Sequence, residues 1–523
     1  MTQFITAEEA AALISDNAAV AVGGHLGFGT PDGLFKALRE RYDQIRHPEN
    51  LTLIKMATVG DGHTRGCDRL AADGLIGTVI TSHLGLEPKL ARHIGQNKCF
   101  AYTLPAGTIL KLYRAIAAGE KAVWTDVGLH TMADPRLEGG KANEKTRREG
   151  KEIASVVSID GDEYLQYRTF PIHVCLIRGS FADEDGNISL QREAMTGEQL
   201  EIAAATHNSG GIVIVQVEDV VPRGSLDPRL VALHRFLVDY VVISRPKYHR
   251  QSFSQYIYRP ELIRQGKIRT DKCVSLPLDN RKVCARRALM EIRRGDLINL
   301  GIGIPEAIGY AAAEEGFGSD LILSSDSGVI GGSPLSGLDM GAAIHPEATL
   351  KTADMFNLCC GGALNVCALG MAEIDGLGNV NVSKFNGRVI GPGGFMDLAQ
   401  NSKKILLMGT FTAGNLQEVC ADGKLTIVRE GTYKKFKKSV EQITFSGEYA
   451  AKRDQHVLII TERAVFRLTV EGLMLTEVAP GIDIERDILR QMEFKPLICD
   501  TLRYMDERIF KEGRMGIKDT VMK

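Results

Sequence analysis

One acidic residue in the second half of the chain stands where its type and neighbours could support chemistry. The segment LILSSDSGVIGG (321–332) reads as a short apolar strand, Leu321 to Leu323, then small polar residues around Asp326, then a Gly-x-x-Gly-Gly turn. Aspartate is a poor strand residue and a good turn former. The stretch alone is therefore typical of a turn-stabilising acid, but a carboxylate just past a strand end could also be a reactive group.

Glycine-rich loops of the same half could surround this carboxylate. They are NLGIGIP (299–305), VIGPGGFMDL (389–398) and GTFTAG (409–414). Backbone amides at Gly393 and Gly394 could form an oxyanion hole, because glycine lets a backbone approach a reacting carbonyl closely. Close strand–helix packing would explain the first loop equally well, and that loop is not a complete G-x-G-x-x-G fingerprint.

A lone carboxylate among glycine loops is the best candidate for covalent chemistry. The chain has no Gly-x-Ser-x-Gly elbow and no Walker loop, and its 12 histidines lack ligand spacing, so no metal site is predicted. A carboxylate that attacks an acyl donor forms a mixed anhydride. Such an anhydride keeps the energy of a thioester, which suits the movement of coenzyme A (CoA) between acids.

The lysine-rich stretch YKKFKK (433–438) has two interpretations. It places four lysines around Phe436. A solvated charged face is the usual explanation, and a rim for the phosphates and adenine ring of a nucleotide-bearing ligand is the alternative.

Apolar runs that alternate with helical patterns must position these groups. GIVIVQV (211–217), KILLMG (404–409) and HVLII (456–460) read as buried strands, and PDGLFKALRERY and PEAIGYAAAEEG read as helices. Continuous Val/Ile/Leu strands separated by helices predict an α/β fold with a mainly parallel sheet covered on both faces.

Two internal echoes predict a duplicated unit. GFGTPDGLFKAL from Gly27 matches GIGIPEAIGYAA from Gly301, and CLIRGSFADEDGNISL from Cys175 matches CALGMAEIDGLGNVNV from Cys367. We expect two similar open α/β domains, 1–265 and 266–523, with an insertion in the first near residues 125–151. The active site is expected in the cleft between them, because open α/β sheets bind ligands at the carboxyl ends of their strands.

Composition sets the remaining limits. A chain of 523 residues needs more than one core, and a net charge of −2 gives no indication of a nucleic-acid or anionic-membrane partner. There is no signal-peptide pattern, no long apolar run and no C-x-x-C pair among ten cysteines. We expect a cytoplasmic protein.

The chain resembles family I CoA-transferases, in particular the single-chain propionate/acetate CoA-transferases. The resemblance extends from ITAEEAAALI near the start to MDERIF near the end. The blocks that carry it include ADPRLEGGK, FPIHVCLIRGSFADEDGNI, HNSGGIVIVQVE, NLGIGIP, GNVNVSKFNGR, GTFTAG, QITFSG, ITERAVF and EVAPGIDIERDIL. The resemblance implies two similar α/β domains in a homo-oligomer, a dimer or tetramer. It also implies acyl-CoA and small carboxylic acids as substrates and no permanently bound cofactor.

In that family, a glutamate attacks acyl-CoA, and CoA thiolate then converts the anhydride into an enzyme–CoA thioester in a ping-pong cycle. The resemblance places Asp326 at the nucleophile position. It implies oxyanion donors at Gly393 and Gly394 and polar support from Asn299. The residues expected along the CoA are Gly301, Gly303, Gly391, Gly409, Lys384 and Lys435.

Three departures from the family pattern bear on activity. Aspartate is one methylene shorter than glutamate, and a misplacement of about 1 Å can cost on the order of 100-fold in rate. LPAG replaces a Gln-Gly pair, which puts Ala106 where an amide would stand, and CGGALN replaces GGGLD, giving Ala363 and Asn365. Ala106 also makes the acyl pocket more apolar, which favours a longer or bulkier acyl group.

The departures leave two alternatives to CoA transfer. A retracted Asp326 could act as the general base of an acyl-CoA thioesterase. The chain could also be a non-catalytic acyl-CoA-binding paralogue.

Overall fold

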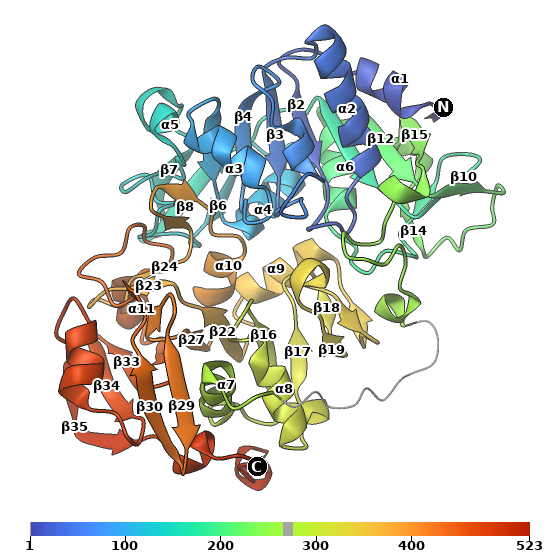
Figure 1. The fold of residues 1–523 in the computed structure, drawn as a ribbon. Coiled ribbons are helices and arrows are strands. Elements are labelled where there is room, and N and C mark those ends of the chain that lie inside the picture. The colour runs from blue at the N-terminus through green and yellow to red at the C-terminus, as the bar shows by residue number, and fades with distance from the viewer. Residues whose placement is uncertain (1, 265–275, 523) are drawn as a thin grey trace.

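Two large sheets, one from each half of the chain, organise the computed structural model (Figure 1). The structure describes residues 2–264 and 276–522, so the predicted domain boundary between 265 and 266 falls outside the described residues and stays a prediction. The α/β prediction is confirmed.

The first sheet has eight strands, all parallel to their neighbours. Its central strands β2 and β9 are fully buried and largely apolar, as expected for a sheet covered by helices on both faces. In spatial order the strands are β1 (Gln3–Phe4), β15 (Tyr240–Ile243), β12 (Ile212–Val217), β9 (Val174–Arg178), β2 (Ala19–Val22), β3 (Leu51–Lys55), β4 (Ile76–Thr81) and β5 (Phe100–Thr103). Its main helices are α1 (Ala7–Ala12), α2 (Asp32–Ile45), α3 (Pro88–Gly95), α4 (Ala106–Ala117) and α6 (Gln199–Asn208).

The second sheet has ten strands and mixes parallel with antiparallel pairs. In order they are β21 (Ala348–Thr349), β18 (Val329–Ile330), β17 (Ile322–Ser324), β16 (Leu297–Leu300), β22 (Val366–Gly370), β27 (Lys404–Met408), β32 (His456–Ile460), β33 (Ala464–Thr469), β34 (Gly472–Val478) and β35 (Leu497–Tyr504). Its main helices are α7 (Asn280–Leu289), α8 (Ala307–Glu314), α9 (Thr352–Cys360) and α10 (Phe395–Ala399).

The same parallel arrangement occurs in both sheets, which confirms the duplicated unit. The order β15-β12-β9-β2-β3 in the first sheet corresponds to β32-β27-β22-β16-β17 in the second. Both sequence echoes fall at matching places: the G-x-G-x-P loops follow β2 and β16, and the two Cys segments contain β9 and β22.

The halves differ after these shared strands. Between α4 and β9 the first half contains a three-stranded sheet of β6 (Ala122–Thr125), β8 (Asp162–Arg168) and β7 (Ala154–Ile159), together with α5 (Glu144–Glu149). The second half passes from α9 to β22 without such a sheet. The insertion predicted near 125–151 thus lies within this additional unit.

Helices α9 and α10 join the two halves. Ala353 and Phe356 of α9 and Met396 of α10 belong to a buried cluster formed mainly by α4 and the first sheet. Figure 1 shows both helices between the two sheets. These helices therefore bring the strand ends of the first sheet close to those of the second sheet. Across residues 2–264 and 276–522, no helix has the length and apolar character needed to cross a membrane.

Candidate active site

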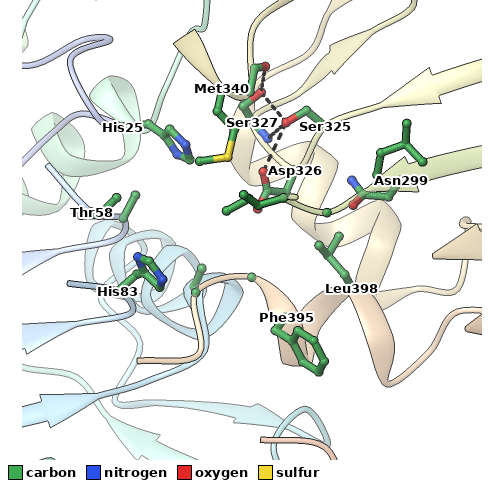
Figure 2. A pocket seen from close by; sticks show the side chains of 18 of the residues that line it. His25, Thr58, His83, Asn299, Ser325, Asp326, Ser327, Met340, Phe395 and Leu398 are labelled. Carbon is green, nitrogen blue, oxygen red and sulfur yellow. Dashed lines mark hydrogen bonds between the residues drawn. The ribbon is translucent and has the colours of Figure 1, made fainter. Parts of the chain in front are cut away.

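A cavity of about 720 Å³ lies between the halves and contains the predicted nucleophile (Figure 2). Loops that follow β2, β3 and β4 form one wall, and the loops after β16, β17 and β22 and the start of α10 form the other. The cavity therefore lies where the active site was expected, since these loops leave the carboxyl ends of parallel strands.

Asp326 lies in a tight turn between the antiparallel strands β17 and β18. The turn is closed by hydrogen bonds from the Ser325 amide to the Val329 carbonyl (2.9 Å) and from the Gly328 amide to the Ser325 carbonyl (3.0 Å). Gly328 has a φ of +100°, which explains the glycine. The turn-forming and the reactive interpretations of Asp326 are therefore compatible, since the turn itself presents the carboxylate to the cavity.

The serines beside Asp326 fix the turn. The Ser327 hydroxyl donates to the Gly341 carbonyl (2.7 Å), and the Ser325 hydroxyl lies 3.3 Å from a carboxylate oxygen of Asp326. Asn299, which is buried, donates from its amide to the Ser324 carbonyl at 3.3 Å. Asn299 thus holds the strand end just before the turn and also lines the cavity, and its role as polar support stays a prediction.

The glycine loop before α10 approaches Asp326 closely. A Cβ placed on Gly394 would lie 2.8 Å from Asp326 Oδ2 and 3.1 Å from the Phe356 ring, so only glycine fits. The Gly393 amide donates to the Ser82 carbonyl (3.0 Å) in the other half. The prediction of a free oxyanion donor at Gly393 is therefore wrong. Within the described residues the Gly394 amide has no acceptor, so it remains the candidate donor.

Two histidines of the first half face the same cavity, and sequence reasoning missed both. His25 follows β2 and His83 follows β4 (Figure 2). Burial lowers the pKa of His25, an effect that the nearby Asp326 opposes. Burial, with the charge of Lys55, lowers the pKa of His83 to about 4. Both histidines stand at strand ends within the triplet His-Leu-Gly, a signal that could have marked them.

A buried ion pair supports the wall that carries His83. Lys55 Nζ lies 2.9 Å from Glu87 Oε2, and both side chains are fully buried. The same ammonium group donates to the carbonyls of Ala57 (3.0 Å) and His83 (2.9 Å). Burial raises the pKa of Glu87 to about 7 in spite of Lys55. Lys55 therefore holds the cavity-lining loops after β3 and β4 through these two carbonyls.

The start of α4 and helix α10 are hydrogen-bonded across the two halves. The Ala106 amide donates to the Gly393 carbonyl (3.0 Å), and the Gly107 amide donates to Asp397 Oδ2 (3.1 Å). Burial raises the pKa of Asp397 to about 7. Ala106 lines the cavity and brings no polar side-chain group to it. Asn365 lies outside the cavity lining and accepts a hydrogen bond from the Leu297 amide (2.9 Å), so its substitution does not reach the site directly.

The predicted CoA-binding residues divide into two groups. Gly301 and Gly391 line the cavity, although the Gly301 amide donates to the Ala368 carbonyl (2.7 Å) and the Gly391 amide to the Ser383 carbonyl (2.9 Å). The other four residues are not among those that line it: Gly303, Gly409, Lys384 and Lys435. Their contacts with CoA stay predictions.

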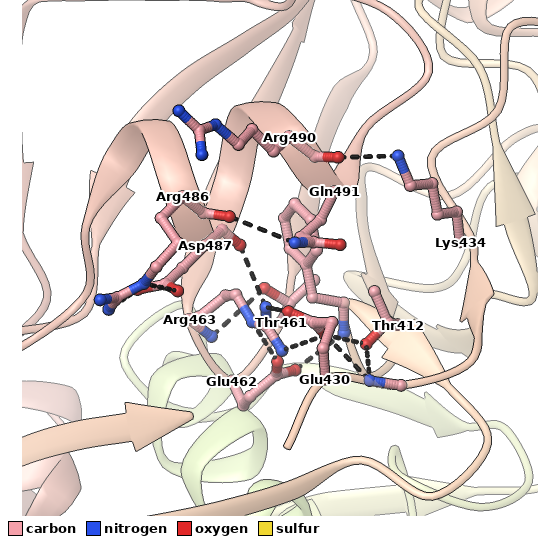
Figure 3. A network of polar contacts seen from close by, with 12 residues as sticks. Thr412, Glu430, Lys434, Thr461, Glu462, Arg463, Arg486, Asp487, Arg490 and Gln491 are labelled. Carbon is pink, nitrogen blue, oxygen red and sulfur yellow. Dashed lines mark hydrogen bonds and ion pairs between the residues drawn. The ribbon is translucent and has the colours of Figure 1, made fainter. Parts of the chain in front are cut away.

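The lysine-rich stretch is largely occupied by internal contacts. Phe436 is completely buried and stacks on Phe411 with ring centroids 4.4 Å apart, so the idea that it stacks on an adenine ring is wrong. Lys434 donates to the Arg490 carbonyl (2.7 Å), beside an ion-pair network around Arg463 (Figure 3). Lys435 is buried, and burial lowers its pKa to about 8. Because Lys434 is hydrogen-bonded within the protein and Lys435 and Phe436 are buried, the segment is neither a simple solvated face nor a free phosphate-binding rim.

Comparison with known proteins identifies the family to which the chain belongs. The family model described as Coenzyme A transferase matches residues 4–244 and 282–486, so the chain belongs to the coenzyme A transferase family. The chain is 40% identical over 518 residues to the protein named acetate CoA-transferase YdiF of Escherichia coli O157:H7, covering 98% of this chain and 96% of that protein. It is also 40% identical to the caffeate CoA-transferase of Acetobacterium woodii, with complete coverage of both.

The fold agrees with solved structures of the same class. The apoenzyme of the acyl-CoA transferase YdiF from E. coli O157:H7 superimposes with a TM-score of 0.92 over 98% of this chain and 97% of that chain. A structure described as the thioester complex of that enzyme with CoA gives the same TM-score. The sequence-based prediction of a CoA-transferase is confirmed.

Proposed function

We propose that this enzyme transfers CoA from an acyl-CoA to a carboxylic acid, with the Asp326 carboxylate as nucleophile. The observation that carries the proposal is the position of Asp326, which projects from a rigid turn into the cavity between the halves, directly beside Gly394. The relatives named for acetate and for caffeate support the reaction class.

The reaction proceeds in two half-reactions. A carboxylate oxygen of Asp326 attacks the acyl carbonyl, the C–S bond breaks, and a mixed anhydride and CoA thiolate form. The thiolate attacks the aspartyl carbonyl, which releases the first acid as carboxylate and leaves an aspartyl–CoA thioester. The acceptor carboxylate then attacks this thioester, and the thiolate released attacks the new acyl carbonyl. The new acyl-CoA leaves and the Asp326 carboxylate is regenerated.

The short side chain of Asp326 favours a second candidate function. An aspartate that cannot reach the acyl carbon leaves space for a water molecule, which the carboxylate could activate as general base. The enzyme would then be an acyl-CoA thioesterase. The two functions differ in their need for an acceptor acid.

A paired assay separates these functions. Acetyl-CoA is incubated with the enzyme, with and without propionate, and acyl-CoA esters and free thiol are followed by chromatography. Acceptor-dependent propionyl-CoA with little free thiol supports transfer, whereas equal release of free CoA without propionate supports hydrolysis. A wider panel of acids, including aromatic ones, then defines the acyl group. Absence of every product would support the binding-only alternative.

The nucleophile is tested by substitution and trapping. Asp326→Asn should reduce transfer at least about 1,000-fold, because an amide cannot form the anhydride. In the wild-type enzyme, acyl-CoA without acceptor should produce a CoA adduct on the peptide that contains Asp326, detectable by mass spectrometry. Asp326→Glu should keep the adduct. Transfer by the Asn variant at the wild-type rate would contradict the proposal.

A further inference from the structure

The cavity wall opposite Asp326 carries an imidazole to which the reaction scheme above gives no role. His83 lies just past the end of β4, and its ring faces the cavity on the side of the first half (Figure 2). It adjoins the loop before α10, since a Cβ on Gly393 would lie 3.6 Å from His83 Cδ2. His83 therefore lies against the loop that carries Gly394.

Hydrogen bonding fixes the tautomer of this imidazole. The Gly85 amide donates to His83 Nδ1 at 3.1 Å, so Nδ1 carries the lone pair. Burial, Lys55 and His25 together lower the pKa of His83 to about 4, so the ring is neutral at pH 7. The single ring proton therefore lies on Nε2. Within the described part of the chain, this N–H has no acceptor.

The proposed chemistry needs a donor of this kind. When the carboxylate adds to the acyl carbonyl, negative charge develops on the carbonyl oxygen. Removing one hydrogen-bond donor from such an oxygen typically lowers the rate roughly 100- to 1,000-fold. The Gly393 amide is occupied by the Ser82 carbonyl, and Ala106 offers no side-chain donor. Of the groups on the loop before α10 and at the start of α4, the Gly394 amide is thus the remaining candidate donor, and His83 is the imidazole that adjoins this loop.

The backbone around His83 is held from three directions. Lys55 binds the His83 carbonyl (2.9 Å), and the His83 amide donates to Thr81 Oγ1 (3.3 Å). The next residue, Leu84, donates to the Ile390 carbonyl (2.7 Å) in the other half. A donor fixed in this way needs little reorganisation during the reaction.

We propose that His83 is a catalytic residue whose neutral imidazole donates its Nε2–H to the carbonyl oxygen of the reacting acyl group, together with the Gly394 amide. This role rests on the proposed function. The electron pair of the carbonyl π bond moves onto the oxygen as the carboxylate adds, and it returns when the thiolate leaves. The imidazole remains neutral throughout and transfers no proton.

Substitutions of His83 test the donor directly. His83→Phe keeps the ring shape but removes the N–H, and kcat should fall about 100-fold with KM changed less than about threefold. His83→Gln should stay within about tenfold of the wild type, because its amide can donate. In the His83→Phe background, Ala106→Gln supplies a side-chain amide from another cavity-lining residue that adjoins Gly393, and it should restore kcat at least about tenfold.

A second variant displaces the ring without changing it. A Cβ on Gly85 would lie 2.4 Å from His83 Cε1, so Gly85→Ala should push the imidazole from its position. Its kcat should fall nearly as much as that of His83→Phe. His93→Phe is the control, because His93 is a buried imidazole on α3 outside the cavity lining. Its kcat should match the wild type.

The outcomes separate this role from the proposed function. Nitrogen-detected NMR of the histidines should find a neutral Nε2–H ring for His83 between pH 5 and 8. An active wild-type enzyme with a folded His83→Phe variant of unchanged kcat would overturn the role and leave the proposed function intact. Equal losses in the Phe and Gln variants without rescue by Ala106→Gln would also overturn it. A wild-type enzyme that shows neither acyl exchange nor hydrolysis would overturn both the role of His83 and the proposed function.

Discussion

The two G-x-G-x-P loops have the same sequence pattern but opposite environments. In the first half, Phe28 between the two glycines is only 1% exposed, and a Cβ on Gly27 would lie 2.2 Å from the Phe253 amide nitrogen. In the second half, the corresponding Ile302 is 60% exposed and lines the cavity, and a Cβ on Gly301 would lie 3.1 Å from the Ala368 carbonyl oxygen. The second glycines differ in the same way, because a Cβ on Gly29 would lie 2.8 Å from Gln199 Nε2, whereas a Cβ on Gly303 would meet nothing within 4 Å. One loop is sealed by packing and the other is open to ligand.

The loops after the next pair of corresponding strands, β3 and β17, also differ between the halves. The chain leaving β3 runs through a long loop before it returns as the parallel strand β4, and Met56, Ala57 and Thr58 face the cavity there. The chain leaving β17 reverses at once into the antiparallel strand β18, and this turn presents Asp326. Duplication thus produced two similar scaffolds, of which one carries Asp326, the proposed nucleophile, and the other carries the wall with His25 and His83.

The sealed loop gives the largest expected effect on stability. Phe28 packs with Met195 of its own half and with Val329, Ala342 and Ala343 around the Asp326 turn. Phe28→Ala should therefore lower the free energy of unfolding by about 3–5 kcal/mol, measured by urea denaturation. A loss below 1 kcal/mol would show that the loop is not sealed in solution, and the comparison of the two loops would fail.

The close approach of Gly394 to Asp326 gives the next largest effect. Gly394→Ala places a methyl group 2.8 Å from the carboxylate, which should displace it and reduce kcat about 100-fold with little change in stability. Gly309→Ala on α8 is the control, since the new Cβ would meet Leu323 at an ordinary 3.5 Å. Equal steady-state kinetics of the two variants would mean that Asp326 does not need its observed position.

The contact between the halves should depend on pH through Asp397. Its pKa is raised to about 7, so the folded state binds the proton more tightly than the unfolded chain does. The stabilisation from protonated Asp397 is complete below its ordinary pKa of 3.8, declines as the pH rises and is lost above about pH 7.

Asp397→Asn should remove this part of the pH dependence. Between pH 5 and 7, the free energy of unfolding of the wild type should fall relative to the variant by at most about 1.4 kcal/mol per pH unit. Urea midpoints at several pH values measure the difference. Parallel curves for both proteins would place the titration elsewhere.

The open loop gives the smallest effect. Ile302→Ala removes an exposed side chain, so stability should change by less than about 0.5 kcal/mol. The KM for acyl-CoA should rise about three- to tenfold, because apolar contact with the ligand is lost. If KM did not change, the open loop would lie outside the ligand path, and the contrast with the sealed loop would concern packing alone.

The repeated architecture, and the place of Asp326 just past a strand end, could be predicted from the sequence. Buried parallel strands are continuous Val/Ile/Leu runs, so β12, β27 and β32 were identifiable by composition. The echoes at Gly27 and Gly301 followed from duplication, and Asp326 stood out because an acid between serines is unusual after an apolar strand. The strand and turn signals are local, and each echo is a likeness between two short segments that can be read without knowing any contact between them.

The tertiary structure decided which groups are available for chemistry. The Gly393 amide is taken by Ser82, Phe436 lies in an aromatic core, and His83 reaches the cavity from the other half. Each of these outcomes depends on contacts between segments distant in the chain, and hydrophobic periodicity contains no information about such contacts. The sequence by itself determined the duplicated α/β scaffold and the carboxylate at its strand end. Only the packing of the two halves determined which groups of the first half face Asp326. Whether a hydrogen-bond donor there is free depends on which segment of the other half lies against it.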